Sequence, residues 1–215
     1  MYIFQPDIYL LDEQVRKSAR YISGCVLDVG AGSINRYGKY FKFDKYVRMD
    51  HAHGEKVDAI GSADSIPFPD ESFDSVVCTQ VFEHLENPEK SAREIYRVLK
   101  PGGYLLLTVP QTNELHEEPY DFFRYTKYGL ASLFGSAGFI LEQEHQRGGF
   151  YSTNAQMDIR YVVDLLALYQ RPIIGRIFSK LIFYPYGMIS IFFDKMDTSK
   201  ANKKHTIGWC NVFKK

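Results

Sequence analysis

Short apolar runs alternate with segments of helical periodicity along most of the chain. Five runs have the length of buried strands and end at glycine, proline or polar clusters: 25–29, 46–50, 57–60, 74–79 and 104–109. Apolar residues recur at helical spacing over 11–22, where Gly24 is expected to end the helix, and again from Ala92 to Leu99. This alternation predicts an α/β fold with a mostly parallel sheet.

The helix around 92–99 and a further helix after Thr126 have clear boundary signals. Asn87 and Pro88 are typical of a helix start, and Pro101-Gly102-Gly103 is expected to stop that helix. Thr126 is a candidate cap for a helix that Gly138 ends, and the run 139–144 then reads as a strand.

The C-terminal third has a different pattern. Gly148-Gly149 interrupts the chain, residues 148–205 are helical or irregular and rich in aromatic residues, and 206–213 resembles a last strand at the edge of the sheet. No repeat or low-complexity linker separates these parts. We therefore predict a single domain over 1–215, made of an N-terminal helical segment (1–23), a core (24–147), a helical insertion (148–205) and a last strand (206–215).

Composition and charge narrow the function classes. The 215 residues are 45% hydrophobic and 24% charged, as in folded globular proteins, and 26 basic residues balance 26 acidic ones. A chain without net charge lacks the field that attracts nucleic acid, so we expect no nucleic-acid partner. Three cysteines without close pairing and the lack of a basic, apolar leader favour a cytoplasmic location.

A glycine turn follows the first expected strand. Asp28-Val-Gly30-Ala31-Gly32 places backbone amides and a carboxylate together where side chains must be small. A dinucleotide site requires a third glycine, and Asn35 occupies that position. A carboxylate here instead favours a ligand with a positive end, such as the ammonium and sulfonium of S-adenosylmethionine.

Other polar residues follow the next strands. Asp50 comes after the second strand, where a carboxylate accepts hydrogen bonds from both ribose hydroxyls of an adenosine. Asp64 follows the third strand and is a candidate acceptor for the adenine amino group, and Gln80 follows the fourth strand.

The order and spacing of these motifs resemble the class I S-adenosylmethionine-dependent methyltransferases, in particular the type 11 methyltransferase domain. The resemblance runs from about Gly24 to Phe139 and rests on Val26-Leu-Asp-Val-Gly-Ala-Gly32, Asp50, Asp64-Ser-Ile-Pro-Phe68, Phe73-Asp-Ser-Val-Val77, Val81-Phe-Glu-His-Leu85 and Glu94-Ile-Tyr-Arg-Val-Leu-Lys-Pro-Gly-Gly103. It implies a Rossmann-like three-layer sandwich with a mostly parallel seven-stranded sheet and an antiparallel last strand.

The resemblance also implies S-adenosyl-L-methionine as cofactor and S-adenosyl-L-homocysteine as product. Gly30 and Gly32 would contact its methionine part together with Gln80, Asp50 the ribose and Asp64 the adenine. Many members have a further glycine where this chain has Ser33 or Ile34. The full set of expected cofactor-binding residues is Asp28, Gly30, Ala31, Gly32, Asp50, His51, Asp64, Ser65 and Gln80.

The segment 116–125 mixes acids, a histidine, an arginine and aromatic rings, and it follows the fifth strand, over the mouth of the site in this fold. We expect it to bind the methyl acceptor, with His116 as a general base. The alternative is a lid held by an ion pair between Asp121 and Arg124. The expected acceptor-binding residues are Glu83, His84, Tyr120, Asp121, Arg124 and Tyr125. His51 and His53 are too few ligands for a metal site, so no metal is expected.

These observations predict methyl transfer from S-adenosylmethionine to a small-molecule, sugar or lipid-linked acceptor. Two alternatives stay open, a catalytically silent cofactor-binding partner subunit and an NAD-dependent oxidoreductase. The apolar block 181–193 is too short to span a bilayer. Together with Arg176 and Lys180 it could form a surface, over 173–193, that contacts a membrane peripherally. We favour the other interpretation of that block, a helical cap packed on the sheet or on a partner subunit.

Overall fold

The computed structural model describes residues 3–52 and 56–215. These residues form two compact units, each with its own internal packing. The larger unit comprises 14–110, 116–145 and 209–215 and contains nearly all of the sheet. The smaller unit comprises the chain up to Glu13 together with 111–115 and 146–208, and it is mainly helical.

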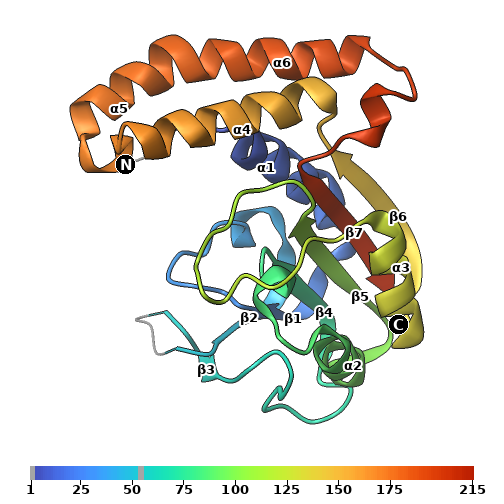
Figure 1. The fold of residues 1–215 in the computed structure, drawn as a ribbon. Coiled ribbons are helices and arrows are strands. Elements are labelled where there is room, and N and C mark those ends of the chain that lie inside the picture. The colour runs from blue at the N-terminus through green and yellow to red at the C-terminus, as the bar shows by residue number, and fades with distance from the viewer. Residues whose placement is uncertain (1–2, 53–55) are drawn as a thin grey trace. The chain divides into compact units, whose positions relative to one another are not determined.

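A seven-stranded sheet has the order β3-β2-β1-β4-β5-β7-β6 (Figure 1). Its strands are β1 (Ser23–Val29), β2 (Lys42–Asp50), β3 (Ala59–Ile60), β4 (Phe73–Thr79), β5 (Leu99–Pro110), β6 (Ile140–Arg147) and β7 (Gly208–Lys214). The pairs β1–β2, β1–β4, β2–β3 and β4–β5 are parallel, whereas β7 runs opposite to β5. The predicted mostly parallel sheet with an antiparallel last strand is confirmed.

The last strand is not an edge strand, and that part of the prediction is wrong. β7 lies between β5 and β6, and all its residues except Lys214 are buried. The Phe213 ring stacks on Phe134 with centroids 4.6 Å apart. A strand enclosed on both edges and both faces gains burial along its whole length, which the order of segments in the chain does not reveal.

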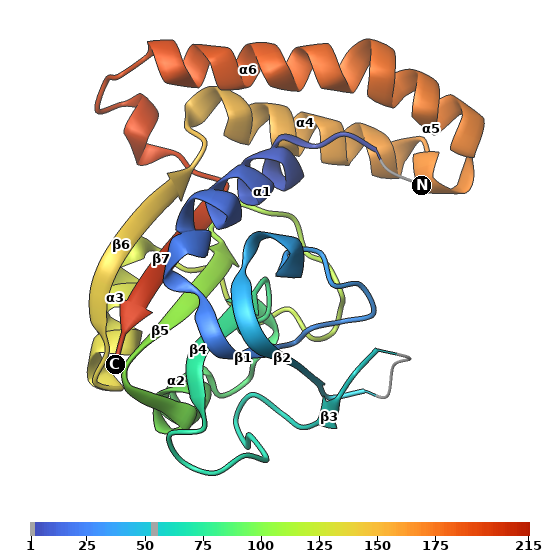
Figure 2. The same ribbon diagram turned by 180° about the vertical axis from the view of Figure 1, so that it is seen from behind.

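Helices cover both faces of this sheet. On one face lie α2 (Pro88–Val98) and α3 (Lys127–Ser136), which pack against each other (Figures 1 and 2). On the other face the end of α1 (Pro6–Ser18) meets the sheet, where Gln14 donates to the His145 carbonyl and the Ser18 hydroxyl lies 3.8 Å from the Cys210 sulfur. The arrangement is the predicted three-layer sandwich.

Two helix predictions are confirmed and one needs correction. Thr126 caps α3 by accepting a hydrogen bond from the Gly129 amide, and α2 begins at Pro88 as expected. The first helix spans Pro6–Ser18 and a short 3₁₀ turn follows it, so it begins before residue 11 and ends before Gly24. Pro6 occupies the first position of the helix, where proline is favoured, and the periodicity of apolar residues does not show this start.

Two glycine-containing signals that were predicted to end helices instead belong to strands. Gly24 lies in β1 at φ +71°, and a side chain there would collide with Asp74, whose carboxylate accepts the Cys25 amide hydrogen. Pro101, Gly102 and Gly103 lie in β5, which begins at Leu99 directly after α2. Helix and strand are thus joined without a loop at this point.

The smaller unit is built from the helices α4 (Phe150–Leu165), α5 (Pro172–Phe178) and α6 (Tyr184–Met196). A π-helical turn, Ser179–Phe183, joins α5 to α6, and α4 packs against α6. Asp194 accepts hydrogen bonds from the amides of Gly149, Tyr151 and Ser152, so a carboxylate from α6 caps the start of α4. Over the described residues, no helix is long and apolar enough to span a bilayer.

Candidate cofactor site

A cavity of about 850 Å³ opens at the carboxyl ends of β1, β2 and β4. This is the edge at which parallel α/β sheets bind ligands, because the loops after neighbouring strands converge there. The described residues that line it are Val29, Gly30, Gly32, Met49, Asp50, His51, Gly61, Ser62, Ala63, Gln80, Val81, His84, Leu85, Glu117 and Tyr120. All belong to the larger unit.

The glycine turn after β1 forms one wall. Gly30 and Gly32 have φ values of +70° and +56°, and a side chain on Gly30 would collide with Val81. The amides of Gly30 and Ala31 both donate to the Met49 carbonyl, at 2.9 and 3.1 Å, which folds the turn over the end of β2. Glycine is favoured at both positions because the backbone is left-handed, and at Gly30 also because Val81 leaves no room for a side chain.

Arg48 holds this turn from beneath, and sequence reasoning missed it. Its buried guanidinium donates through Nη2 to the carbonyls of Ala31 and Gly32, at 3.1 and 2.8 Å, and through Nη1 to the Lys56 carbonyl at 2.6 Å. A single basic residue inside the otherwise apolar run 46–49 was the available signal. A charge at a buried strand position needs partners, and here the partners are loop carbonyls.

Asp50 lies at the junction of the turn and β2. Its Oδ2 accepts the Gly32 amide hydrogen at 2.9 Å, and its Oδ1 lies 2.9 Å from His51 Nδ1 and 3.3 Å from the Ala52 amide nitrogen. The carboxylate therefore has a defined orientation on the cavity wall. His51 itself is largely exposed, and His53, the other histidine considered for metal binding, lies outside the described residues.

Asp28 is placed differently from the lining residues. It is buried beneath the turn, and its carboxylate accepts a hydrogen bond from the Tyr46 hydroxyl at 2.8 Å. Burial raises the pKa of Asp28 to about 6, although Tyr46 and Arg48 act in the opposite direction. Among the described residues that line the cavity, Asp28 is absent.

The third expected carboxylate, Asp64, also has partners of its own. It accepts from the Ser62 hydroxyl at 2.5 Å and pairs with Lys90 at 3.4 Å, and the Ser62 hydrogen bond, followed by Lys90, lowers its pKa. The described wall at this point consists of Gly61, Ser62 and Ala63, without Asp64 or Ser65.

Gln80 also lines the cavity. Its backbone is left-handed (φ +54°), and its amide and side chain both bond Thr108 of β5, at 2.9 and 3.1 Å. A non-glycine residue in this conformation costs of order 1 kcal/mol and persists where surrounding contacts enforce it, which is common at binding sites.

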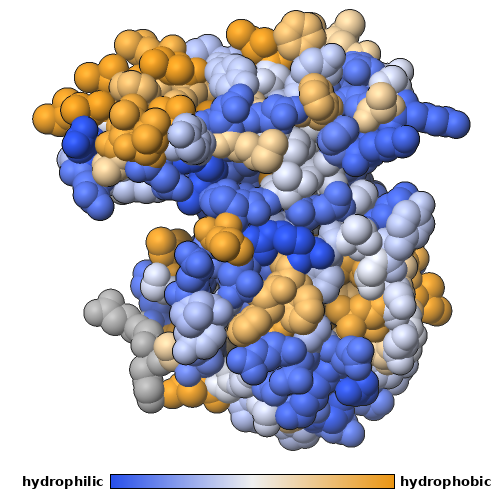
Figure 3. All heavy atoms as spheres, viewed as in Figure 1, coloured by the Kyte–Doolittle hydropathy of each residue, from blue (hydrophilic) through white to orange (hydrophobic). Residues whose placement is uncertain are grey.

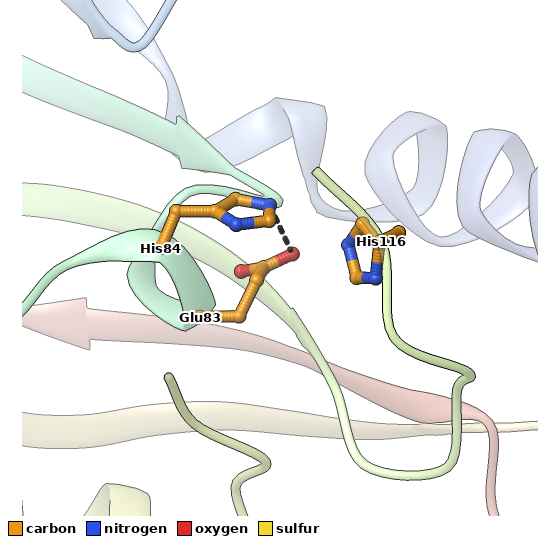
Figure 4. Close-up of side chains that lie close together, drawn as sticks. All are labelled: Glu83, His84 and His116. Carbon is orange, nitrogen blue, oxygen red and sulfur yellow. Dashed lines mark ion pairs between the residues drawn. The ribbon is translucent and has the colours of Figure 1, made fainter. Parts of the chain in front are cut away.

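Beyond Gln80, two histidines and a buried acid lie together (Figure 4). His84 Nδ1 lies 2.5 Å from the Tyr120 carbonyl oxygen, and its Nε2 lies 3.9 Å from Oε1 of the fully buried Glu83. The His84 and His116 rings meet edge to face with centroids 4.9 Å apart. The fold thus brings together residues that are about thirty positions apart in the sequence.

His116 is held by an ion pair behind it. Asp121, whose side chain is 2% exposed, binds Arg124 through two hydrogen bonds of 2.6 and 2.8 Å and accepts the His116 amide hydrogen at 2.9 Å. Arg124 therefore holds the pKa of Asp121 well below its usual range. The ion pair expected of a lid is present.

The predicted acceptor residues separate into two groups. His84 and Tyr120 line the cavity, while Glu83, His116, Asp121, Arg124 and Tyr125 lie outside its described lining. Tyr125 is buried and its hydroxyl donates to the Phe82 carbonyl at 3.0 Å. The Glu83 carbonyl accepts the amide hydrogens of Phe122 and Phe123, so the segment 116–125 is anchored to the 3₁₀ turn after β4.

Glu83, His84 and His116 each offer a metal-ligating atom within 4.8 Å of the others. However, Arg124 Nη2 lies 3.4 Å from His116 Nδ1. This contact occupies Nδ1 of His116, one of the ring nitrogens that a metal ion would need, so the arrangement favours proton chemistry over metal binding.

Comparison with known proteins gives a consistent result. The family model of a methyltransferase domain matches residues 27–107. The ubiquinone/menaquinone biosynthesis C-methyltransferase of Pseudoalteromonas translucida is 31% identical over 107 residues, 48% of this chain and 37% of that protein. A probable S-adenosylmethionine-dependent methyltransferase of Mycolicibacterium smegmatis is 32% identical over 124 residues, 54% of this chain and 45% of that protein. The match thus spans less than half of either relative.

Solved structures share the fold over almost the whole chain. A putative methyltransferase from Bacillus halodurans aligns with a TM-score of 0.55 at 19% identity, covering 94% of this chain and 96% of that one. The [4+2]-cyclase SpnF aligns with a TM-score of 0.58 at 22% identity, covering 95% and 79%. Through residues 27–107 and the sheet built on them, the chain is similar to the class I S-adenosylmethionine-dependent methyltransferases, a family that takes S-adenosyl-L-methionine as methyl donor.

Proposed function

We propose that this protein transfers the methyl group of S-adenosylmethionine to a small-molecule acceptor at the mouth of the cavity. The observation that carries the proposal is the pairing of Gly32 with Asp50, which joins a side-chain-free turn to an oriented carboxylate on one wall. A bound S-adenosylmethionine would supply an activated methyl group on its sulfur. The protein has to hold this cofactor, bind the acceptor and take up the acceptor's proton.

The cofactor is held, in this proposal, by residues around the cavity. The turn at Gly30, Ala31 and Gly32 leaves room for the methionine end, Asp50 with His51 binds the ribose hydroxyls, and Gln80 contacts the methionine side. The adenine lies near Ser62, with Asp64 and Ser65 behind it. Asp28 acts from beneath, as part of the support of the turn together with Tyr46 and Arg48.

The acceptor proton leaves through a histidine. His84 faces the cavity, and its Nδ1 is engaged by Tyr120, which leaves Nε2 as the basic nitrogen of the neutral ring. Buried Glu83 stabilises the imidazolium that forms. His116, predicted as the base, remains the alternative, because Asp121 orients it beside the same ring.

We propose a sugar or lipid-linked molecule as the acceptor. Tyr120, Phe122 and Phe123 present exposed rings on the segment 116–125, and rings of this kind bind the apolar faces of sugars and isoprenoid or acyl chains. Arg124 is engaged with Asp121 through both terminal nitrogens, which favours a neutral contact group on the acceptor over an anionic one.

Calorimetry with S-adenosylhomocysteine and NADH tests the cofactor assignment, since the oxidoreductase alternative requires NADH to bind. Methyl transfer is then measured with a panel of sugars and lipid-linked acceptors. Binding of S-adenosylhomocysteine without turnover, together with co-purification of an active homologue, would favour the silent-subunit alternative. The structural likeness to a cyclase makes the turnover measurement essential, because the fold is compatible with other reactions.

A further inference from the structure

The helices α5 and α6 form one continuous helical segment from Pro172 to Met196, interrupted only by the π turn. Its buried residues recur almost every four positions: Gly175, Ser179, Phe183, Gly187, Ser190 and Ile191. Four-residue steps on a regular α-helix drift by about 40° each. The wider π turn offsets this drift, so one face stays buried along the whole segment.

The opposite face is apolar and exposed. Ile173, Leu181 and Met196 are 74%, 72% and 66% exposed, and between them lie further exposed side chains: Ile177, Ile182, Ile189 and Phe192. Figure 3 shows hydrophobic residues gathered over α5. Scattered exposed apolar residues are ordinary, but a continuous stripe of this kind marks an interaction surface.

Charge along this segment is mainly basic. Residues 165–193 contain Arg171, Arg176 and Lys180 and no aspartate or glutamate. Of the acids on the packed helices, Asp158 accepts from the Tyr186 hydroxyl at 2.6 Å and Asp194 caps α4, while Asp164 near the end of α4 is exposed. Within the segment from Pro172 to Met196, the three basic residues Arg176, Lys180 and Lys195 outnumber the single acid, Asp194, so the apolar stripe lies on a helical segment of net positive charge.

We propose that the α5–α6 face binds the surface of an anionic lipid bilayer, with the helical segment lying parallel to that surface. Arg176 and Lys180 are both exposed, and their long side chains reach lipid phosphates while the apolar stripe enters the acyl boundary. A second copy of the chain is the less suitable occupant, because a two-fold interface on this face would bring the same basic residues together. This surface is independent of the cofactor cavity, which lies in the other unit.

Vesicle co-sedimentation tests the proposal. The probes are vesicles of phosphatidylcholine alone and of equal parts phosphatidylcholine and phosphatidylglycerol. We expect binding to the anionic vesicles that weakens as salt is added, and a loss of about tenfold or more in the exposed-face variant Leu181→Glu. The double variant Arg176→Glu/Lys180→Glu should lose the preference for phosphatidylglycerol.

Matched controls separate this effect from misfolding. Ile140→Glu replaces a residue of similar exposure on β6, and Lys45→Glu/Arg93→Glu reverses two exposed charges elsewhere; both should bind vesicles like the wild type. The affinity for S-adenosylhomocysteine should be the same in every variant as in the wild type. If the wild type itself does not bind S-adenosylhomocysteine, the cofactor assignment fails, and the vesicle result still stands by itself. Wild-type protein that stays in the supernatant with both vesicles overturns the proposal. So does a dimer that Leu181→Glu dissociates without any vesicle binding, which would assign the face to self-association.

Discussion

His84 Nδ1 and the Tyr120 carbonyl oxygen are 2.5 Å apart. A carbonyl oxygen only accepts hydrogen bonds, so the hydrogen of the neutral ring lies on Nδ1 and the lone pair lies on Nε2. Tyr120 belongs to the segment that covers the cavity, whereas His84 belongs to the 3₁₀ turn after β4. This hydrogen bond therefore sets the tautomer of the histidine and adds to the contacts with Glu83 that hold the covering segment.

Asparagine at position 84 separates these two roles. In His84→Asn the side-chain amide can still donate toward Tyr120 while the basic Nε2 is lost. We expect turnover to fall about 10²-fold with S-adenosylhomocysteine affinity nearly unchanged. The parallel variant His116→Asn should have a smaller effect on turnover, measured in the same assay. If only His116→Asn lowers turnover, the base is His116. Equal loss of stability, cofactor affinity and turnover in both variants would make the segment 116–125 structural.

Asp50→Ala should weaken cofactor binding. The change removes charge-assisted hydrogen bonds to the ribose and also the acceptor for the Gly32 amide, at a cost of about 2 to 3 kcal/mol in affinity. Isothermal calorimetry with S-adenosylhomocysteine measures it. Asp44→Ala, an exposed carboxylate on the same strand, is the control and should bind normally. An unchanged dissociation constant for Asp50→Ala would show that Asp50 does not hold the ribose.

Arg48→Met should loosen the glycine turn. Methionine fills the space of the side-chain stem but leaves the carbonyls of Ala31 and Gly32 without their donor and Asp28 without a nearby cation. We expect a loss of about 3 kcal/mol in the free energy of unfolding, measured by urea titration, together with weaker cofactor binding. Lys42→Met on the exposed part of β2 should change neither quantity.

Asp28 should make the protein less stable as pH rises. Its pKa is raised from 3.8 to about 6 in the folded state, so between these values the folded protein binds more protons than the unfolded chain, and unfolding free energy decreases with pH. The full contribution is of order 3 kcal/mol. Asp28→Asn mimics the neutral carboxyl, so its stability relative to wild type should increase from pH 4 to pH 7. Parallel pH profiles of the two proteins would contradict this assignment.

Removal of divalent cations should leave methyl transfer intact. Arg124 Nη2 lies 3.4 Å from His116 Nδ1 and therefore competes with a cation for this ring nitrogen. Turnover measured with and without EDTA is therefore expected to be equal. A loss of activity that added Mg²⁺ or Mn²⁺ restores would instead identify Glu83, His84 and His116 as ligands, because they are the described group with suitable spacing.

Local chemistry determined much of what the sequence analysis predicted. An apolar run of five or six residues bounded by breakers forms a strand wherever it is buried, and the turn at Gly30 needs left-handed backbone that few other residues adopt. The caps at Pro88 and Thr126 act within a single helical turn. These features depend on residues that are close in the sequence, so they can be predicted without a structure.

Tertiary structure alone decided the remainder. β7 lies between β5 and β6 because burial on both edges outweighs chain order, and Asp28 is covered by Tyr46, a residue from another strand. Arg48 meets the glycine turn, and His84 meets Tyr120, across loops of many residues. A polar side chain can line a cavity or can lie behind its wall and hold the wall in place. Which of the two it does depends on its burial and on partners that are distant in the sequence, and a local sequence pattern shows neither.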